Sequence, residues 1–104
     1  MEKDILSITE LTKNIKSILE GNFRNVWVNG EVSNLRIPTS GHMYFTLKDE
    51  TSQIKAVMFR NRYAFGQIKL VDGMKVVVRG HITVYEPRGD YQILVEELVL
   101  YFVC

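Results

Sequence analysis

Aromatic and basic side chains occur together in the middle of the chain, in a pattern that could hold a polyanion. Between residues 42 and 60, two runs alternate apolar and polar residues on either side of the polar segment 49–52. Rings can stack on nucleobases, at about 1–3 kcal/mol per base, and lysine or arginine can follow a phosphate backbone. The candidate binding residues are Trp27, Tyr44, Phe59, Lys48, Lys55, Arg60 and Arg62, with Arg36 and Arg88 in flanking loops.

The distribution of charge favours such a partner more than the total charge does. The formal net charge of the 104 residues is +1. Residues 36–88 hold nine basic and four acidic residues, a net charge of +5, whereas the rest of the chain holds four basic and eight acidic residues, a net charge of −4. A positive excess around the two runs indicates a polyanionic partner.

Catalytic and metal-binding motifs are not evident in the sequence. The two histidines, His42 and His81, do not have the spacing of a metal site. The adjacent carboxylates Asp49 and Glu50 fall where a hairpin turn is expected, so we interpret them as turn formers. The sequence has neither a glycine-rich phosphate loop nor a glycine-flanked nucleophilic serine. We therefore expect no catalysis, no cofactor and no metal within these residues.

The sequence also bears on the compartment. A single cysteine, Cys104, cannot form a disulfide framework within the chain. No run of about 18 apolar residues is present, and acidic residues stand near the N-terminus where a secretory signal would carry positive charge. We expect a cytoplasmic protein without a membrane span.

The elements that must position the candidate residues begin with a helix. Apolar residues at helical spacing predict a helix over about residues 8–20, which we expect to pack on one end of a sheet. Ser7 and Glu10 fit a capping box, Thr9 is an alternative N-cap, and Gly21 provides a stop. The apolar stripe of this helix comprises Ile8, Leu11, Ile15, Ile18 and Leu19.

Five strands are predicted between about residues 24 and 102. Residues 24–34 form the first strand, 42–48 and 53–60 a hairpin, and 74–85 and 91–102 the last two strands, joined by a turn at 86–90. Residues 61–72 are expected to form a short helix or irregular connection. Gly30 and Gly80 predict sharp bends or close backbone approaches. A register break is expected at Glu96 and Glu97, and Tyr44 and Lys55 are expected to face each other across the hairpin.

This order of elements predicts a single domain over residues 1–104. Its fold class is all-β with an N-terminal helix, a five-stranded antiparallel OB-fold barrel that fills its interior with alternate apolar residues. An SH3-like barrel and an open five-stranded sheet are the alternatives.

Several segments of the chain carry a resemblance to a known family. They are FRNVWVNGEVSN at 23–34, SGHMYFTLKDE at 40–50, IKAVMFR at 54–60, and Gly80 with Tyr85 and GDYQ at 89–92. Together they resemble the N-terminal domain of the exodeoxyribonuclease VII large subunit over nearly the whole chain. The resemblance implies a bacterial OB-fold that binds single-stranded DNA and presents it to a nuclease domain. In that family the catalytic domain and the region that binds the small subunit lie further along, and we expect both to be absent here.

The resemblance implies a parent enzyme that hydrolyses single-stranded DNA from either end. The second strand is also similar to anticodon-binding OB domains of class II synthetases, in which residues at the places of Tyr44 and Lys55 contact bases. Two alternatives to DNA binding therefore stay open. One is a protein-docking or oligomerisation domain that uses its exposed sheet, and the other is tRNA anticodon-type RNA binding.

Overall fold

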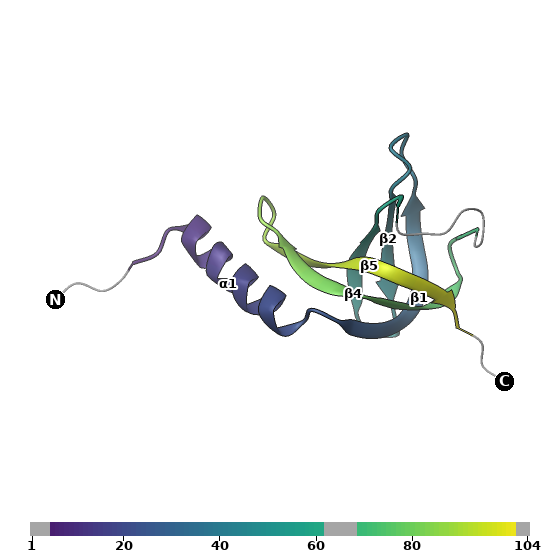
Figure 1. Ribbon diagram of the computed structural model, residues 1–104, viewed down its shortest axis with the longest axis horizontal. Helices are drawn as coiled ribbons and strands as arrows, with labels where there is room; N and C mark the ends of the chain where they lie inside the picture. Colours follow the sequence, from purple (N-terminus) through teal and green to yellow (C-terminus); the bar gives the residue numbers. More distant parts are fainter. Residues whose placement is uncertain (1–4, 62–68, 102–104) are drawn as a thin grey trace.

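The chain folds as one helix followed by a closed five-stranded barrel (Figure 1). The computed structural model describes residues 5–61 and 69–101, so Arg62, Cys104 and most of the expected connection at 61–72 lie outside the described residues. The elements are α1 (Ile8–Asn22), β1 (Val26–Arg36), β2 (Met43–Lys48), β3 (Gln53–Met58), β4 (Lys75–Tyr85) and β5 (Asp90–Leu100). The predicted barrel is confirmed, and the open sheet is excluded.

One strand pair departs from the antiparallel barrel that the sequence predicts. The strands close in the order β1-β2-β3-β5-β4, and β3 pairs with β5 in parallel. The reason is parity: strand directions cannot alternate all the way around a closed ring with an odd number of members. With five strands, at least one neighbouring pair must therefore run in parallel. This pair is decisive for the site, because it places β5 beside the hairpin formed by β2 and β3.

Two glycines allow strands to approach closely, as their positions predict. A Cβ built on Gly30 would lie 3.2 Å from the Lys48 carbonyl oxygen, and one built on Gly80 would lie only 2.2 Å from the Leu94 carbonyl oxygen. Beside Gly80 the β4–β5 register shifts, because Arg79 pairs with Glu97 while Gly80 pairs with Val95. Glu96 is thus the extra residue of a β-bulge, and the predicted register break is confirmed.

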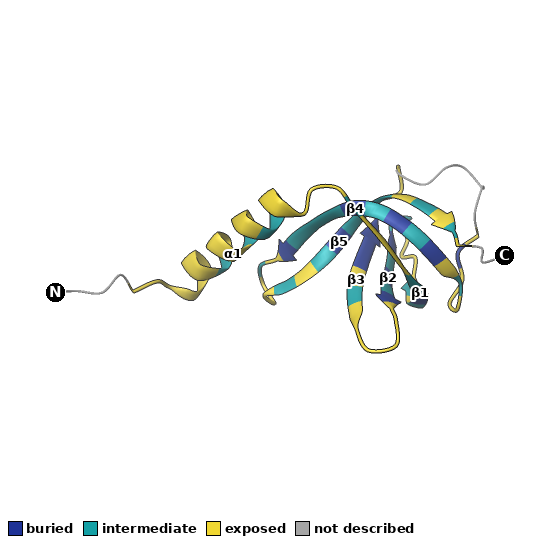
Figure 2. Cartoon of the chain, turned by 90° about the horizontal axis from the view of Figure 1, so that it is seen from below, coloured by how far each residue is buried: buried dark blue, intermediate teal, exposed yellow. Residues whose placement is uncertain are grey.

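The barrel interior is filled by side chains from all five strands. Alternation places Met43, Phe45 and Leu47 of β2 inside, as predicted, and the fully buried Ile93 comes from β5. In Figure 2 the buried positions follow the strands, and exposed ones dominate the turns and α1. The other buried members of the core are Val32, Ala56, Met58, Leu70, Val76, Val78 and Val95. Because the core lies inside the barrel, outward-facing residues are free to form a binding surface.

Helix α1 begins as predicted, but the expected stop at Gly21 is wrong, because the helix continues to Asn22 with Phe23 as its C-cap and Gly21 does not adopt a positive φ. The capping box of Ser7 and Glu10 is present, since each side chain accepts a hydrogen bond from the other residue's backbone N–H. The helix lies beside β4 through polar contacts: Lys13 and Lys16 pair with Glu86 at 3.3 and 3.0 Å, and Thr83 donates a hydrogen bond to Glu20.

Most of the apolar stripe of α1 remains exposed even though the helix contacts β4, and only Leu19 of the stripe is partly buried. Ile8 is 80% exposed and Ile18 is 62% exposed, and Leu11 and Ile15 are also exposed. The helix position accounts for this exposure, because α1 extends past the end of the barrel (Figures 1 and 2). Among the described residues, no helix is long and apolar enough to cross a membrane.

The β2–β3 turn shows why Asp49 is needed there. One carboxylate oxygen of Asp49 accepts hydrogen bonds from the backbone N–H groups of Thr51 at 3.0 Å and Ser52 at 2.9 Å. These two bonds hold the pKa of Asp49 below its usual value. A side chain committed to backbone donors in this way forms the turn, which agrees with the structural role expected from the sequence.

Candidate functional site

An open groove of about 760 Å³ crosses the outer face of β2, β3 and β5. One side is formed by the end of β1 and the loop after it, and the other by the β4–β5 turn. None of the described residues that line it is acidic. The lining residues are Asn34, Arg36, Pro38, Tyr44, Phe45, Thr46, Lys55, Ala56, Val57, Phe59, Tyr85, Arg88, Gln92 and Leu94.

The groove brings together five of the nine residues that the sequence singles out, namely Arg36, Tyr44, Lys55, Phe59 and Arg88. Tyr44 and Lys55 share a face, but they do not face each other directly. The hairpin register places Tyr44 opposite Val57 and Lys55 opposite Thr46, so the two side chains are diagonal neighbours. The direct pairing expected from the sequence is therefore wrong by two residues: with a turn at 49–52, Lys48 pairs with Gln53, and the same register places Tyr44 opposite Val57.

Three other predicted residues lie elsewhere. Trp27 is 58% exposed on the half of β1 that pairs with β4, opposite Arg79. It therefore lies outside the groove. Lys48 lines a separate hollow near the β2–β3 turn. Arg60 follows β3, and its side chain lies against Gly41 rather than lining the groove. Arg62 lies outside the described residues.

The groove also contains residues that reasoning from the sequence did not select. Gln92 and Leu94 enter it because the parallel pairing sets them beside Lys55 and Val57. Their outward position follows from alternation with the buried Ile93 and Val95, but their neighbours depend on barrel closure. Tyr85 could have been selected from the sequence, because it is an aromatic residue at the end of β4, three positions before Arg88.

Two arginine–tyrosine pairs flank Lys55 in the groove. The Arg36 guanidinium carbon lies 5.8 Å from the centre of the Tyr44 ring, and that of Arg88 lies 4.4 Å from the centre of the Tyr85 ring. Cation–π contacts of this kind orient both groups. Each pair thus offers an aromatic face and a cation within a few ångströms, as stacked bases joined by phosphates require.

Phe59 is held at the end of the groove by His42. The two rings meet edge to face with their centres 5.1 Å apart. The backbone N–H of Arg60 donates to Nδ1 of His42 at 2.9 Å, so Nδ1 acts as an acceptor. His42 therefore orients the hairpin end and Phe59, and this contact gives it a structural role.

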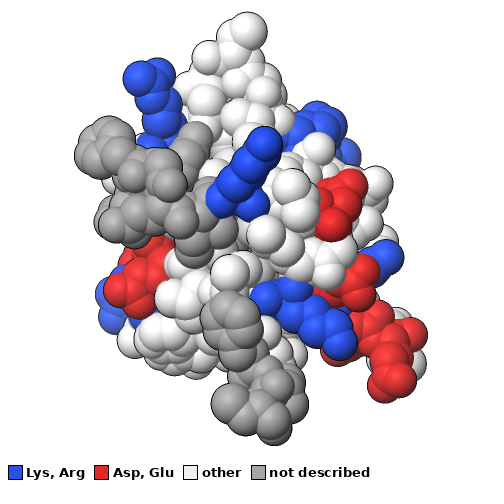
Figure 3. Space-filling view, turned by 90° about the vertical axis from the view of Figure 1, so that its right-hand side faces the viewer, with Lys and Arg blue, Asp and Glu red and all other residues white. Residues whose placement is uncertain are grey.

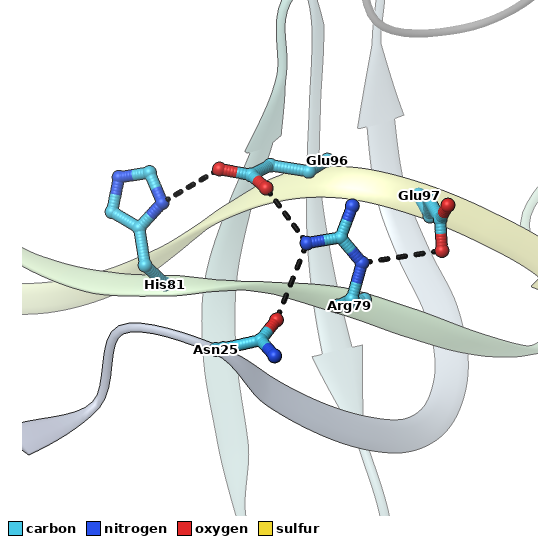
Figure 4. A network of polar contacts seen from close by, with 5 residues as sticks. All are labelled: Asn25, Arg79, His81, Glu96 and Glu97. Atoms are coloured by element: carbon cyan, nitrogen blue, oxygen red, sulfur yellow. Dashed lines mark hydrogen bonds and ion pairs between the residues drawn. The ribbon is translucent and has the colours of Figure 1, made fainter.

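A second polar cluster lies on the β4–β5 face and clamps the bulge (Figure 4). Arg79 donates to Glu96 at 2.8 Å, to Glu97 at 3.2 Å and to Asn25 at 3.2 Å, while His81 contacts Glu96 at 3.1 Å. The bulge explains the pairing, because it lets two consecutive glutamates reach one arginine. Among the described residues, no group of three or more potential ligands could hold a metal ion.

The Arg79 clamp predicts a pH dependence of stability. The hydrogen bond from Arg79 lowers the pKa of Glu96, with a smaller contribution from His81. A lowered native pKa gives stability that is present above the unfolded value of about 4.3 and is lost as the pH falls through the native value. We expect Arg79→Met to lower the thermal midpoint by a few degrees at pH 7, with the difference from wild type shrinking towards pH 3. Circular dichroism melts across this range measure it.

Lys48→Met is a matched control for that measurement, because Lys48 makes no ion pair among the described residues. Its midpoint should follow wild type at every pH. A gap between Arg79→Met and wild type that stays constant down to pH 3 would contradict the role of Glu96.

Basic and acidic side chains are interspersed on the end of the barrel that lies away from α1 (Figure 3). The positive excess of residues 36–88 therefore does not form one continuous patch on this face. We therefore base the role of the groove cations on their placement beside aromatic rings rather than on a uniform positive electrostatic field.

Comparison with known proteins agrees with this geometry. A family model described as an OB-fold nucleic acid binding domain matches residues 6–99. Over 97 residues, the chain is 58% identical to the exodeoxyribonuclease 7 large subunit of Geobacter metallireducens and 44% identical to that of Thioalkalivibrio sulfidiphilus, and each match covers 93% of this chain. The chain spans about a fifth of the length of these curated relatives, 21% and 22% respectively.

Two solved structures share the fold. Asparaginyl-tRNA synthetase from Pyrococcus horikoshii superposes with a TM-score of 0.67 at 21% identity, over 88% of this chain and 22% of the synthetase. A replication protein A heterotrimer bound to single-stranded DNA superposes with a TM-score of 0.61 at 14% identity, over 77% of this chain and 59% of that one. The resemblance seen in the sequence is confirmed, and the chain belongs to the family of OB-fold nucleic acid binding domains, within a segment shared with exodeoxyribonuclease 7 large subunits.

Proposed function

We propose that this chain binds single-stranded DNA in the groove across β2, β3 and β5. The observation that carries the proposal is the alternation of rings and cations along the groove: Arg36 on Tyr44, then Lys55, then Arg88 on Tyr85. Its family and the names of its relatives support the same function.

In this mechanism the rings bind bases and the cations bind the backbone. Tyr44, Phe59 and Tyr85 stack on successive bases, each contributing about 1–3 kcal/mol. Arg36, Lys55 and Arg88 contact phosphates. Because stacking accepts any base, we expect binding that tolerates most sequences. Polar side chains such as Gln92 and Thr46 add hydrogen bonds at the groove floor.

The role of the domain in a larger protein follows from the relatives. We propose that the domain holds single-stranded DNA while a nuclease region outside the 104 residues cleaves it. That region, and any small subunit that assembles with it, would contact parts of the polypeptide beyond the groove. The chain itself contributes binding and orientation rather than chemistry.

A salt titration tests the proposal directly. We expect labelled oligo-dT to bind the chain with a slope of log Kobs against log salt of about −2, because three cations each neutralise one phosphate at about −0.7 per phosphate. Fluorescence anisotropy of the oligonucleotide is the measurement, since Trp27 lies outside the groove and would report poorly. Absence of salt-dependent binding at high micromolar protein would refute the proposal, and preference for a defined RNA loop would favour anticodon-type recognition.

Protein docking is a second candidate function, favoured by a separate observation. The exposed apolar stripe of α1, with Ile8, Leu11, Ile15 and Ile18, lies on a different element from the groove. An apolar helix face of this kind is typical of a surface that another protein segment covers. The two functions use different residues, so substitutions in the groove test DNA binding without altering the apolar stripe of α1.

A further inference from the structure

Two cations of the groove converge on a single carboxylate oxygen. Nε of Arg88 donates to Oδ2 of Asp90 at 2.9 Å, and Nζ of Lys55 lies 3.8 Å from the same atom. Lys55 comes from β3, Arg88 from the β4–β5 turn, and Asp90 from the first position of β5. Among the described residues, these two cations are the partners of the Asp90 side chain.

The convergence is a product of the parallel strand pair. Lys55 pairs with Gln92, and Asp90 precedes Gln92 by two residues, so alternation places Asp90 and Gln92 on the same face of β5. The turn, with Gly89 at a φ of 70°, brings Arg88 back over the same point. Asp90 thus lies beside the groove, next to the two cations that line it.

A carboxylate at this point satisfies the same donors that a backbone phosphate would need. Arginine and lysine bind carboxylate and phosphate oxygens with similar geometry. The hydrogen bond from Arg88, reinforced by Lys55, keeps the pKa of Asp90 below its usual value, so the carboxylate is charged at neutral pH. A phosphate oxygen that takes the place of this carboxylate oxygen would contact both cations at once.

We propose that Asp90 is an internal competitor for phosphate, and that single-stranded DNA binds by displacing its carboxylate from Lys55 and Arg88. This inference rests on the proposed function and adds a residue that limits affinity in the groove.

Asp90→Asn tests the inference, because it keeps the size and a hydrogen-bond acceptor for Arg88 while removing the charge. We expect oligo-dT to bind the variant roughly three- to tenfold more tightly at 0.1 M salt, since two exposed ion pairs no longer need to be exchanged. We expect the salt slope to stay close to that of wild type, because the same two cations contact phosphate in the bound state of both proteins. Labelled oligo-dT anisotropy at four salt concentrations measures both quantities.

Glu50→Gln is the matched control, because it makes the same change in net charge at the β2–β3 turn, and Glu50 does not line the groove. Its affinity for oligo-dT should stay close to that of wild type. A second measurement compares Lys55→Gln with the double variant Lys55→Gln/Asp90→Asn. The change Asp90→Asn should increase affinity by a smaller factor in this background than in wild type, because only one of the two cations paired with Asp90 remains.

The outcomes separate the two claims. If wild type shows no salt-dependent binding, the proposed function fails. If wild type binds but Asp90→Asn binds equally or more weakly, the inference is overturned and Asp90 instead positions Arg88. Should Asp90→Asn lower the thermal midpoint strongly, Asp90→Ser is measured in its place, under the same criteria.

Discussion

Replacing Gly80 with alanine is expected to destabilise the fold by about 3 kcal/mol, because among the described glycines an added Cβ would make its closest backbone contact here. The added Cβ would stand 2.2 Å from the Leu94 carbonyl oxygen and 2.9 Å from its carbonyl carbon. These atoms belong to the backbone of β5, so no side-chain rotation can relieve the contact. The strands must separate at the bulge, where β4 and β5 close the barrel.

Equilibrium urea unfolding followed by circular dichroism measures this loss. A stability of about 5–15 kcal/mol is ordinary for a small domain, so a change of this size moves the midpoint clearly. Gly21→Ala is the matched control: the same substitution in α1 meets no atom within 4 Å and should leave stability unchanged or raise it by up to about 1 kcal/mol. Equal midpoints for Gly80→Ala and wild type would show that β5 can move aside without cost.

The second large effect is expected on binding, from Tyr44→Ala. Loss of one stacking ring should weaken oligo-dT binding roughly 5- to 100-fold, which corresponds to about 1–3 kcal/mol. Arg36, which lies over this ring, would lose its aromatic partner as well. Because the lost interaction is with a base, the affinity should fall at every salt concentration while the salt slope stays nearly constant.

Trp27→Ala provides the control for this measurement. It removes a larger and more exposed ring, but one that lies against β4 outside the groove. We expect its affinity for oligo-dT to match wild type, and Tyr44→Phe to retain most of the affinity because the ring remains. The reverse result, with Trp27 needed and Tyr44 dispensable, would move the binding surface to the β1–β4 face.

Local features of the fold were predictable because each depends on residues close in the chain. The hairpin of β2 and β3 follows from alternation on either side of a turn that Asp49 organises. The capping box at Ser7 and the close approaches at Gly30 and Gly80 follow in the same way. The bulge was also predictable, because two successive glutamates interrupt an alternating strand and cannot both face the core.

Neighbours that lie far apart in the chain were harder to predict, because local patterns do not specify them. Helical spacing identifies the stripe of α1 but does not say whether the barrel covers it, and in the structure Lys13 and Lys16 pair with Glu86 while most of the stripe stays exposed. Alternation alone assigns Trp27 to the outside, but the change of partner along β1, from β4 to β2, decides which outside face it occupies.

The sequence by itself determined that an outward face of this barrel carries rings and cations, because a period of two assigns each strand residue to one side or the other. It also identified Arg36, Tyr44, Lys55, Phe59 and Arg88 as members of the candidate site. Only the tertiary structure decided that the site is a groove completed by Tyr85 and β5. The physical reason is the closure of five strands, which requires a parallel pair and thereby brings Asp90, Gln92 and Leu94 beside the hairpin.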